Sequence, residues 1–297
     1  MEECLPSVVA AAERSPVPCA LRIVDNSSTD DSLNWLASHW PQIEILRQPN
    51  LGLASFNVVL AGLTEPAVLL LNNDVKLDPE SVSPLLRSLE EHPDALFSAP
   101  QCWTFDGQTY EGMRTRVRMR FGLIQGLCRV PGFEKHVATA DLTASAGPIL
   151  AVNRQRFLEI GGYDPIYFPG RIEDLDLGFA AWMRGWKGYY VPESLAYHKG
   201  FGSFEPAFGP GGCDLLAARN SLLFAWKNLS GGRLLQHLAW LPARLAYAAA
   251  RGRTNFLKAF DQAFRAIPQV RNQRRSRSLT QHEWTSRQEA YFRQFRW

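Results

Sequence analysis

The chain has 297 residues, of which 46% are hydrophobic and 21% are charged. This composition is typical of a folded globular protein and excludes a disordered or fibrous chain. No run of about 18 uncharged apolar residues occurs, which excludes an ordinary membrane-spanning helix. Five scattered cysteines without CxxC spacing, and residues 1–4 without the basic and apolar regions of a signal peptide, predict a reducing cytoplasm.

The net charge of +3 hides an asymmetry along the chain. Residues 251–297 contain 11 Lys and Arg and 3 Asp and Glu, a net charge of +8, whereas residues 1–250 contain 21 and 26, a net charge of −5. A basic tail on an acidic body indicates an anionic surface as partner. Because no nucleic-acid-binding motif accompanies the charge, we expect a lipid surface and no nucleic acid.

The first two thirds of the sequence alternate short apolar runs with helical patterns. This alternation predicts an α/β domain with a mainly parallel sheet. The basic segment 104–141 predicts loops around a short hairpin, and 199–203 predicts a glycine-containing loop. In chain order, the predicted elements are strand 21–24, helix 33–39, strand 43–46, helix 54–62, strand 67–71, helix 79–91, strand 96–99, strand 149–152, helix 154–160, helix 173–184 and strand 188–191.

After residue 228 the pattern is helical only, which predicts two domains, 1–228 and 229–297. Pro242 and Gly252 predict breaks that divide this tail into two or three helices. Basic side chains recur every seven residues, so they form one slowly drifting stripe on a helix. These side chains are His237, Arg244, Arg251, Lys258 and Arg265.

The helical tail has two interpretations. A basic amphipathic helix lies on an anionic membrane, and Trp240, Tyr247, Phe256 and Phe260 add aromatic rings of the kind found at membrane interfaces. The alternative is a helix that packs on the first domain with a solvated charged face. We favour the membrane and expect a peripheral protein on its inner face.

Three polar clusters follow or precede predicted elements where open α/β sheets bind ligands. Residues 25–30 combine short polar side chains with a helix N-terminus, which suits a nucleotide. Residues 72–74 place one carboxylate beside two amides, a pattern able to hold a divalent ion ligated by water and phosphate. Residues 173–176 begin a helix, and the segment just before them is rich in aromatic residues and glycine. Desolvation in such a cleft would raise the proton affinity of a carboxylate toward that of a general base.

Each of these patterns also has a purely structural interpretation. The first two clusters could be ordinary turns, and the third could be a helix cap. His198, at the end of a post-strand segment, could be structural, as most lone histidines are. Trp186 could pack at a helix end or stack on a sugar face.

Together and in this order, the motifs resemble those of the family 2 glycosyltransferases, inverting enzymes with a GT-A-type fold that use nucleotide sugars. The resemblance covers residues 1–228. It is most similar to the bacterial rhamnosyltransferase-type members that build cell-surface polysaccharide. Each motif is weak singly, but six in family order are specific. They are Ile-Val-Asp-Asn-Ser-Ser-Thr-Asp (23–30), Asn-Leu-Gly (50–52) with Asn57, Leu-Asn-Asn-Asp-Val (71–75), Gly-Gly-Tyr-Asp (161–164) leading to Glu-Asp-Leu-Asp-Leu (173–177), Arg-Gly-Trp (184–186), and the spacing of 192–198.

The resemblance implies a role for each polar cluster. Asp174 would deprotonate an acceptor hydroxyl, with Glu173 orienting it. Asp74 and His198 would hold a divalent metal, Mg or Mn, that neutralises a diphosphate leaving group. Asp25 would bond the pyrimidine imide of UDP or dTDP. The other implied nucleotide-sugar-binding residues are Asn26, Ser28, Asn50, Gly52, Asn57, Asn72, Asn73, Asp176 and Trp186.

The resemblance also implies the reaction. The donor would be a pyrimidine-diphosphate sugar, such as dTDP-rhamnose or a UDP-sugar. The acceptor would be a hydroxyl of a cell-surface glycan or of a lipid-linked precursor. A single base with in-line attack inverts the anomeric carbon, and no paired acid is needed, unlike in glycoside hydrolysis.

The sequence departs from the family pattern at its beginning. The family starts with a β-strand, whereas residues 1–9 already show the pattern of the first helix. Either the start has been assigned too late, or a truncation removes a neighbour of the inner strands and leaves backbone groups unpaired. The alternative function is therefore a truncated, non-catalytic descendant that binds a membrane or a partner. A weaker alternative is a metal-dependent hydrolase. Asn72 also replaces a more usual acidic residue, which the family tolerates.

Overall fold

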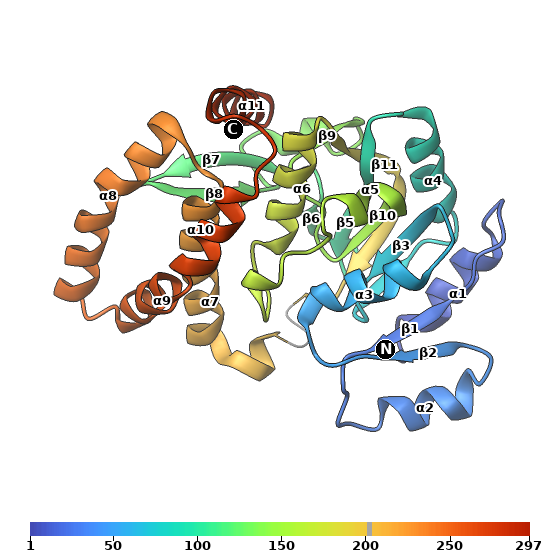
Figure 1. Cartoon of the computed structure of the whole chain (residues 1–297). Helices are drawn as coiled ribbons and strands as arrows, with labels where there is room; N and C mark the ends of the chain where they lie inside the picture. Colours follow the sequence, from blue (N-terminus) through green and yellow to red (C-terminus); the bar gives the residue numbers. More distant parts are fainter. Residues whose placement is uncertain (201–203) are drawn as a thin grey trace.

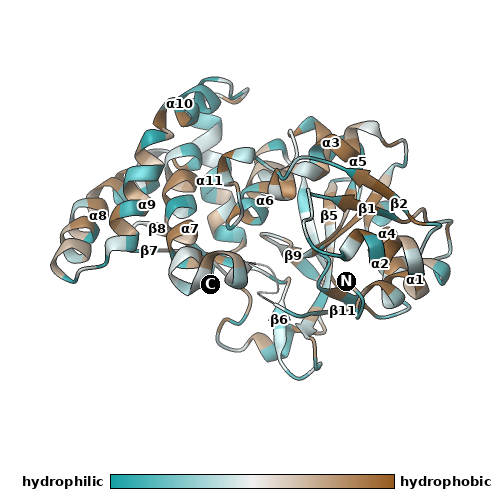
Figure 2. Ribbon diagram, turned by 90° about the horizontal axis from the view of Figure 1, so that it is seen from below, coloured by the Kyte–Doolittle hydropathy of each residue, from teal (hydrophilic) through white to brown (hydrophobic). Residues whose placement is uncertain are grey.

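The computed structural model of the chain describes residues 1–200 and 204–297. An α/β half and a helical half lie side by side, with the chain running from the first to the second (Figure 1). In Figure 2, brown hydrophobic stretches gather on the strands between the helices, as expected for strands buried on both faces.

The central sheet has the strand order β3-β10-β5-β11-β4. Strand β10 runs antiparallel to both β3 and β5, whereas β5 and β11 are parallel. Strands β3, β5 and β11 therefore point the same way, as predicted, and β10 and β4 are reversed. The bounds are β3 (Ala67–Leu71), β4 (Val75–Leu77), β5 (Ala95–Thr104), β10 (Ile149–Asn153) and β11 (Lys187–His198), with β6 (Tyr110–Gly112) on β5 and β9 (Asp141–Thr143) on β11.

Two further strands form a separate parallel pair, β1 (Arg22–Asp25) and β2 (Glu44–Arg47). Among the described residues, β1 pairs only with β2, and β3 pairs only with β10. A salt bridge of 3.0 Å between Arg22 and Glu65 connects the two sheets. The segment predicted as the first helix forms α1 (Leu5–Glu13), which precedes β1.

Helices cover the sheet, and α6 (Glu173–Arg184) is shared by two hydrophobic cores. Leu177 and Ala181 of α6 pack on the sheet side. Leu175 and Phe179, on another face of the same helix, pack against the helical half. The other helices of this half are α2 (Ser32–His39), η1 (Gly52–Ala54), α3 (Ser55–Gly62), α4 (Val82–Glu91), η2 (Phe133–His136), α5 (Arg154–Glu159) and η3 (Pro165–Tyr167).

The helical half returns to α6 at its end. Tyr291 contacts Phe179 with ring centroids 5.0 Å apart, and Phe224 contacts Phe179 at 5.4 Å. The hydrophobic core thus crosses residue 228, and a division there stays a proposal. The helices are α7 (Phe204–Asn228), α8 (Gly231–Ala250), α9 (Thr254–Arg265), α10 (Ile267–Arg275) and α11 (Gln281–Gln294).

Several elements differ from the sequence prediction. Helix α8 continues through Pro242, which lies on its exposed face where water can pair the freed carbonyl, while Gly252 at φ 60° does separate α8 from α9. The segment 204–228 is helical, kinked at Gly209, although no helix is predicted there. The predicted hairpin is β7 (Arg116–Arg120) with β8 (Leu123–Leu127). The loop predicted at 199–203 lies partly outside the described residues.

Candidate active site

Two polar turns follow the ends of β1 and β2 and are tied together. Asp25 is buried at the end of β1, and its carboxylate accepts the amide of Ser28 at 2.9 Å. Asn26 donates its side-chain amide to the carbonyl of Gly52 at 3.3 Å, and its own side-chain oxygen is buried without a hydrogen-bond partner. An unpaired buried acceptor is costly, so this oxygen marks a place where a ligand donor can bind.

The turn after β2 packs against the loop that precedes α6. Asn50 accepts the amide of Gly52 at 3.1 Å, and Gly52 has φ of 59°, a conformation that favours glycine. A Cβ atom at Gly52 would lie 2.9 Å from the carbonyl oxygen of Pro169, so a side chain is also excluded sterically. The predicted nucleotide residues of β1 and β2 therefore lie beside the loop that leads to Glu173.

A histidine and two carboxylates meet where β3 and β11 end. His198 Nε2 lies 3.4 Å from Asp74 Oδ2, and His198 Nδ1 lies 2.8 Å from Glu111 Oε2. Burial disfavours the imidazolium, but the charges of Asp74 and Glu111 outweigh burial and raise the pKa of His198. Burial favours protonated Asp74, yet His198 outweighs it and lowers the pKa of that carboxyl. The structure thus places the two predicted metal ligands in contact.

This pair has the chemistry of a partial metal site. Asp74 Oδ1 is buried and has no hydrogen-bond partner, so it is free to bind a cation. In the described part of the chain, no group of three or more His, Cys, Asp or Glu residues is arranged to hold a metal. Asp74 and His198 would therefore supply two ligands, and a diphosphate and water would supply the others. Of the neighbouring amides, Asn73 is exposed and Asn72 is half-buried.

A cavity of about 410 Å³ lies beside Asp74. Asp30, Asp31 and Trp35 line it from the turn after β1 and from α2, and Lys199 lines it from the end of β11. Lys199 also forms a 2.8 Å ion pair with Glu3. The cavity thus joins the turn after β1 to the predicted metal ligands.

The predicted base lies at the N-terminus of α6. Arg171 and Ile172, just before it, have φ of 80° and 74°, a left-handed backbone that non-glycine residues rarely adopt. Burial raises the pKa of Asp174, and hydrogen bonds from the Leu175 amide partly offset this effect. Burial together with the charge of Asp174 raises the pKa of Glu173 to about 8. Two adjacent carboxyls with raised proton affinity are typical of a functional site.

Asn220 of α7, which the sequence analysis missed, fixes this strained turn. It is fully buried, and its side-chain amide lies 2.9 Å from the carbonyl of Tyr167 and 2.7 Å from the carbonyls of Gly170 and Arg171. The helical half therefore shapes the backbone that presents Glu173. The sequence contains no local signal for this contact, because the partners are about fifty residues apart.

A series of contacts between small side chains leads from Asp174 toward the Asp74–His198 pair. Ser145 lies near the Asp174 carboxylate and lowers its pKa, and the Ser145 hydroxyl donates to that of Thr115 at 3.2 Å. Thr115 in turn lies 3.3 Å from the thiol of Cys128. A Cβ on Gly112, the residue after Glu111, would meet that thiol at 2.3 Å. Contiguous packing thus runs from Asp174 to the residue beside the partner of His198.

Two predicted sugar-site residues have other partners. Asn57 makes two hydrogen bonds, of 2.7 and 2.9 Å, with the backbone of Tyr163. Asp176 is buried and binds Tyr167 at 2.8 Å, Lys227 at 2.6 Å and Asn228 at 2.6 Å. These contacts use the polar atoms of both residues within the protein, so the structure lends no support to direct sugar contacts by Asn57 and Asp176, which stay predictions.

Trp186 and His198 lie at opposite ends of β11. Trp186 precedes β11, whereas His198 ends that twelve-residue strand. The Trp186 ring packs near the guanidinium of Arg156, 5.7 Å from the ring centroid. The position of Trp186 at the other end of β11 from His198 gives no support to the expected sugar contact, which stays a prediction.

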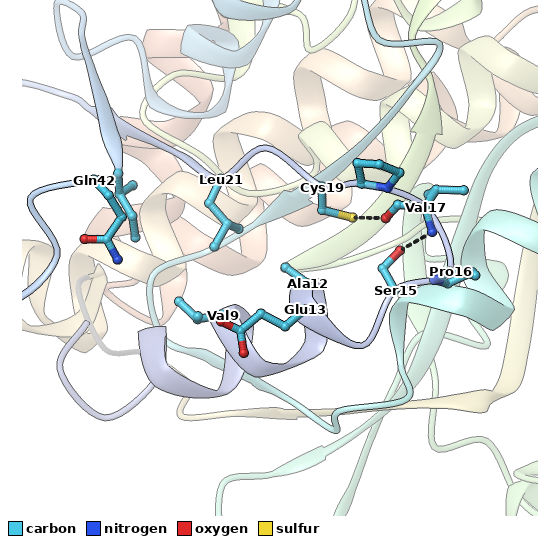
Figure 3. Close-up of a pocket in the computed structure, with 11 residues that line it drawn as sticks. Val9, Ala12, Glu13, Ser15, Pro16, Val17, Cys19, Leu21 and Gln42 are labelled. Atoms are coloured by element: carbon cyan, nitrogen blue, oxygen red, sulfur yellow. Dashed lines mark hydrogen bonds between the residues drawn. The ribbon is translucent and has the colours of Figure 1, made fainter.

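A second cavity, of about 630 Å³, lies between α1 and the beginnings of β1 and β2. Val9, Leu21 and Cys19 point into it, and Gln42 lies at its rim (Figure 3). It is at the N-terminal ends of the strands, whereas Asp25 follows the C-terminal end of β1. Its lining is mixed, and Glu13 is the only carboxylate among the described residues that line it.

The fold is of the GT-A type, as two solved structures of similar architecture show. Staphylococcus aureus TarS in complex with UDP-GlcNAc matches with a TM-score of 0.54 and 13% identity, over 98% of this chain and 85% of that one. A mannosyltransferase from Pyrobaculum calidifontis, in complex with GDP-Man and Mn²⁺, matches with 0.51 and 16%, over 98% and 80%. At these identities the likeness shows the fold alone.

The sequence model of glycosyl transferase family 2 matches residues 1–159, more than half of the chain. The chain belongs to this family, as the motifs predicted. A similar curated protein is the N-acetylglucosaminyl-diphospho-decaprenol L-rhamnosyltransferase of Mycobacterium tuberculosis. It is 28% identical over 223 residues, which is 67% of this chain and 71% of that protein. The rhamnosyltransferase-like resemblance is thus confirmed.

Proposed function

We propose that the chain transfers a sugar from a pyrimidine-diphosphate donor to a hydroxyl of a polyprenyl-diphosphate-linked glycan, with inversion. One observation carries the proposal. A raised-pKa carboxyl pair at the start of α6 is joined by contiguous packing to the Asp74–His198 pair. The mycobacterial relative supports a deoxyhexose such as rhamnose as the sugar and an N-acetylglucosaminyl lipid as the acceptor.

In the proposed mechanism, Asp174 accepts the proton of the acceptor hydroxyl. The hydroxyl oxygen forms a bond to the anomeric carbon from the face opposite the diphosphate. The bond from that carbon to the diphosphate oxygen breaks, and the nucleoside diphosphate leaves with the electron pair. Glu173 stays protonated near neutral pH because its pKa is raised to about 8, so it does not compete with Asp174 for the proton.

Other residues bind and orient the substrates. The buried carboxylate of Asp25 would bond the pyrimidine imide, and the unpaired oxygen of Asn26 would accept a donor from the nucleoside. Asp74 and His198 would hold a divalent cation, Mg or Mn, which when bound neutralises the charge of the leaving diphosphate. The unpartnered Asp74 oxygen supports this assignment, as does the Mn²⁺ in the solved structure of the Pyrobaculum calidifontis mannosyltransferase.

The place of action follows from the acceptor. A polyprenyl-linked acceptor lies in a bilayer, so we propose that the protein acts in the cytoplasm on the inner face of the cell membrane, with residues 229–297 nearest the lipid. In the described part of the chain, none of the helices has the length and apolarity needed to cross a bilayer. Peripheral association is therefore the mode that we propose.

The experiment is a donor screen with a short-chain polyprenyl-diphosphate N-acetylglucosamine acceptor and Mn²⁺. We expect transfer from one pyrimidine-diphosphate sugar, with an anomeric configuration opposite to that of the donor by NMR. Retention of configuration would contradict Asp174 as the base. Release of free sugar without acceptor would favour a hydrolase, and a folded chain that binds no donor would favour a non-catalytic protein.

A further inference from the structure

The outward face of α8 is apolar along its whole length. Leu235 is 68% exposed and Leu238 is 47% exposed, values unusual for leucine in a helix of a folded protein. At 100° per residue, the exposed residues fall on one face. In the two views of Figures 1 and 2, α8 lies at the end of the molecule opposite α1. The other exposed apolar residues of this face are Ala239, Pro242, Ala243 and Ala246.

The basic side chains of α8 point toward the protein instead. His237 is buried and hydrogen-bonds the carbonyl of Gly122 at 2.7 Å. Arg244 donates to the carbonyl of Arg120 at 3.0 Å, and Arg233 pairs with Glu289 at 2.8 Å. The first two members of the predicted seven-residue stripe are thus used in packing. The basic side chains therefore face the protein together with Leu234 and Leu241, which pack on the core, and the outward face of this helix, which the structure describes in full, has no charged side chain.

Aromatic and basic residues border this face. Phe121, at the turn between β7 and β8, is 50% exposed and contacts Trp240 with ring centroids 5.1 Å apart. At the other end of α8, the exposed Arg251 and Arg253 lie 5.8 and 5.1 Å from the ring of Tyr247. The sequence contains no Asp or Glu from residue 215 to residue 260. The border therefore has only positive formal charge in this stretch.

We propose that the outer face of α8, with Phe121, docks into the interfacial layer of an anionic bilayer. An uncharged helical face with aromatic and basic borders suits shallow insertion beneath acidic headgroups. The charge complementarity favours a lipid surface over a second copy of the chain, because a matching face contains no Asp or Glu from residue 215 to residue 260 that could pair with Arg251 and Arg253. The proposal deepens the proposed function, since it names the surface that would bring the enzyme to a lipid-linked acceptor.

The experiment is flotation of the full chain with vesicles. We expect binding to vesicles of phosphatidylcholine with about one quarter phosphatidylglycerol, and weaker binding to phosphatidylcholine alone. The double variant Leu235→Glu/Leu238→Glu should bind at least about tenfold more weakly, because two buried apolar contacts are lost. Both side chains are exposed, so folding should be unaffected. The control is Val58→Glu on α3, a residue 49% exposed that lies outside the proposed surface and should leave binding unchanged.

Other outcomes would overturn the proposal. They are absence of vesicle binding by the wild-type chain, equal loss with Val58→Glu, or a dimer in analytical ultracentrifugation that the double variant dissociates. Transfer to a water-soluble acceptor separates this inference from the proposed function. We expect that transfer to be unchanged in the double variant. If the wild-type chain binds vesicles, the double variant does not, and neither transfers sugar, the result would contradict the proposed function alone.

Discussion

Glu111 holds the imidazole of His198 from the side opposite Asp74, with 2.8 Å between Oε2 and Nδ1. This contact fixes the ring so that Nε2 faces Asp74. Histidines that bind metals commonly donate their other nitrogen to a carboxylate, which sets the tautomer and the orientation of the ring. Glu111 comes from β6, a short strand that pairs with β5 at the edge of the sheet.

Glu111→Gln should weaken Mn²⁺ binding in the presence of nucleoside diphosphate by about 10- to 100-fold, because the amide no longer orients His198. Manganese electron paramagnetic resonance measures this affinity directly. The matched control is Glu91→Gln at the exposed end of α4, which should bind Mn²⁺ as the wild type does. Unchanged Mn²⁺ affinity in Glu111→Gln would show that Glu111 has no part in positioning the ligand.

Asp74→Asn should abolish the gain in nucleotide affinity that Mn²⁺ provides, because the amide is a much poorer cation ligand. Nucleotide binding without metal should change little or become slightly tighter, since a negative charge is removed near the diphosphate. Calorimetric titration with UDP and dTDP, with and without Mn²⁺, tests this. If the variant keeps the full metal-dependent gain, Asp74 is not a metal ligand.

Asn220→Ala should affect both stability and turnover. The substitution leaves the carbonyls of Tyr167, Gly170 and Arg171 without their buried donor, which costs about 1–3 kcal/mol of unfolding free energy. We also expect kcat to fall while the donor KM stays near its wild-type value, because the turn presents the base and not the nucleotide. Exposed Asn272→Ala, in α10, is the control. A loss of stability with wild-type kcat would limit Asn220 to a structural role.

Glu173→Gln should flatten the pH dependence of stability. The folded-state pKa of about 8 lies above the ordinary 4.5, so the native chain binds a proton that the unfolded chain has released between these values. Wild-type stability should therefore fall as pH rises from about 5 to 8, by up to about 1.4 kcal/mol per pH unit from this group. Urea unfolding at several pH values measures the slope. Identical slopes in both proteins would contradict the raised pKa.

The sequence predicted what depends on local pattern. Strand 67–71 and helix 173–184 match the structure at both ends, because apolar runs and an acidic helix start are local signals. Asp74 and Asp174 could be proposed for the same reason. Glu111, Ser145 and Asn220 could not, because their importance comes from contacts between distant segments.

Residues 229–297 show what the spacing of basic side chains can and cannot predict. The seven-residue recurrence of His237 and Arg244 correctly placed both side chains on one face of a helix. It did not show which face meets the protein, where backbone carbonyls of the β7–β8 turn form hydrogen bonds with both side chains. Helical spacing therefore predicts which residues share a face, while tertiary hydrogen bonding decides whether that face is buried.

The most direct test of the account is a comparison of Asp174→Asn with the wild type in two assays. Donor affinity is measured by calorimetry, and a single turnover is measured with saturating donor and acceptor. We predict an unchanged donor Kd and a transfer rate lower by about 10²- to 10⁴-fold, the usual contribution of a general base. A wild-type rate in a variant that binds donor normally would contradict Asp174 as the base. Equal losses of binding and rate would make it structural.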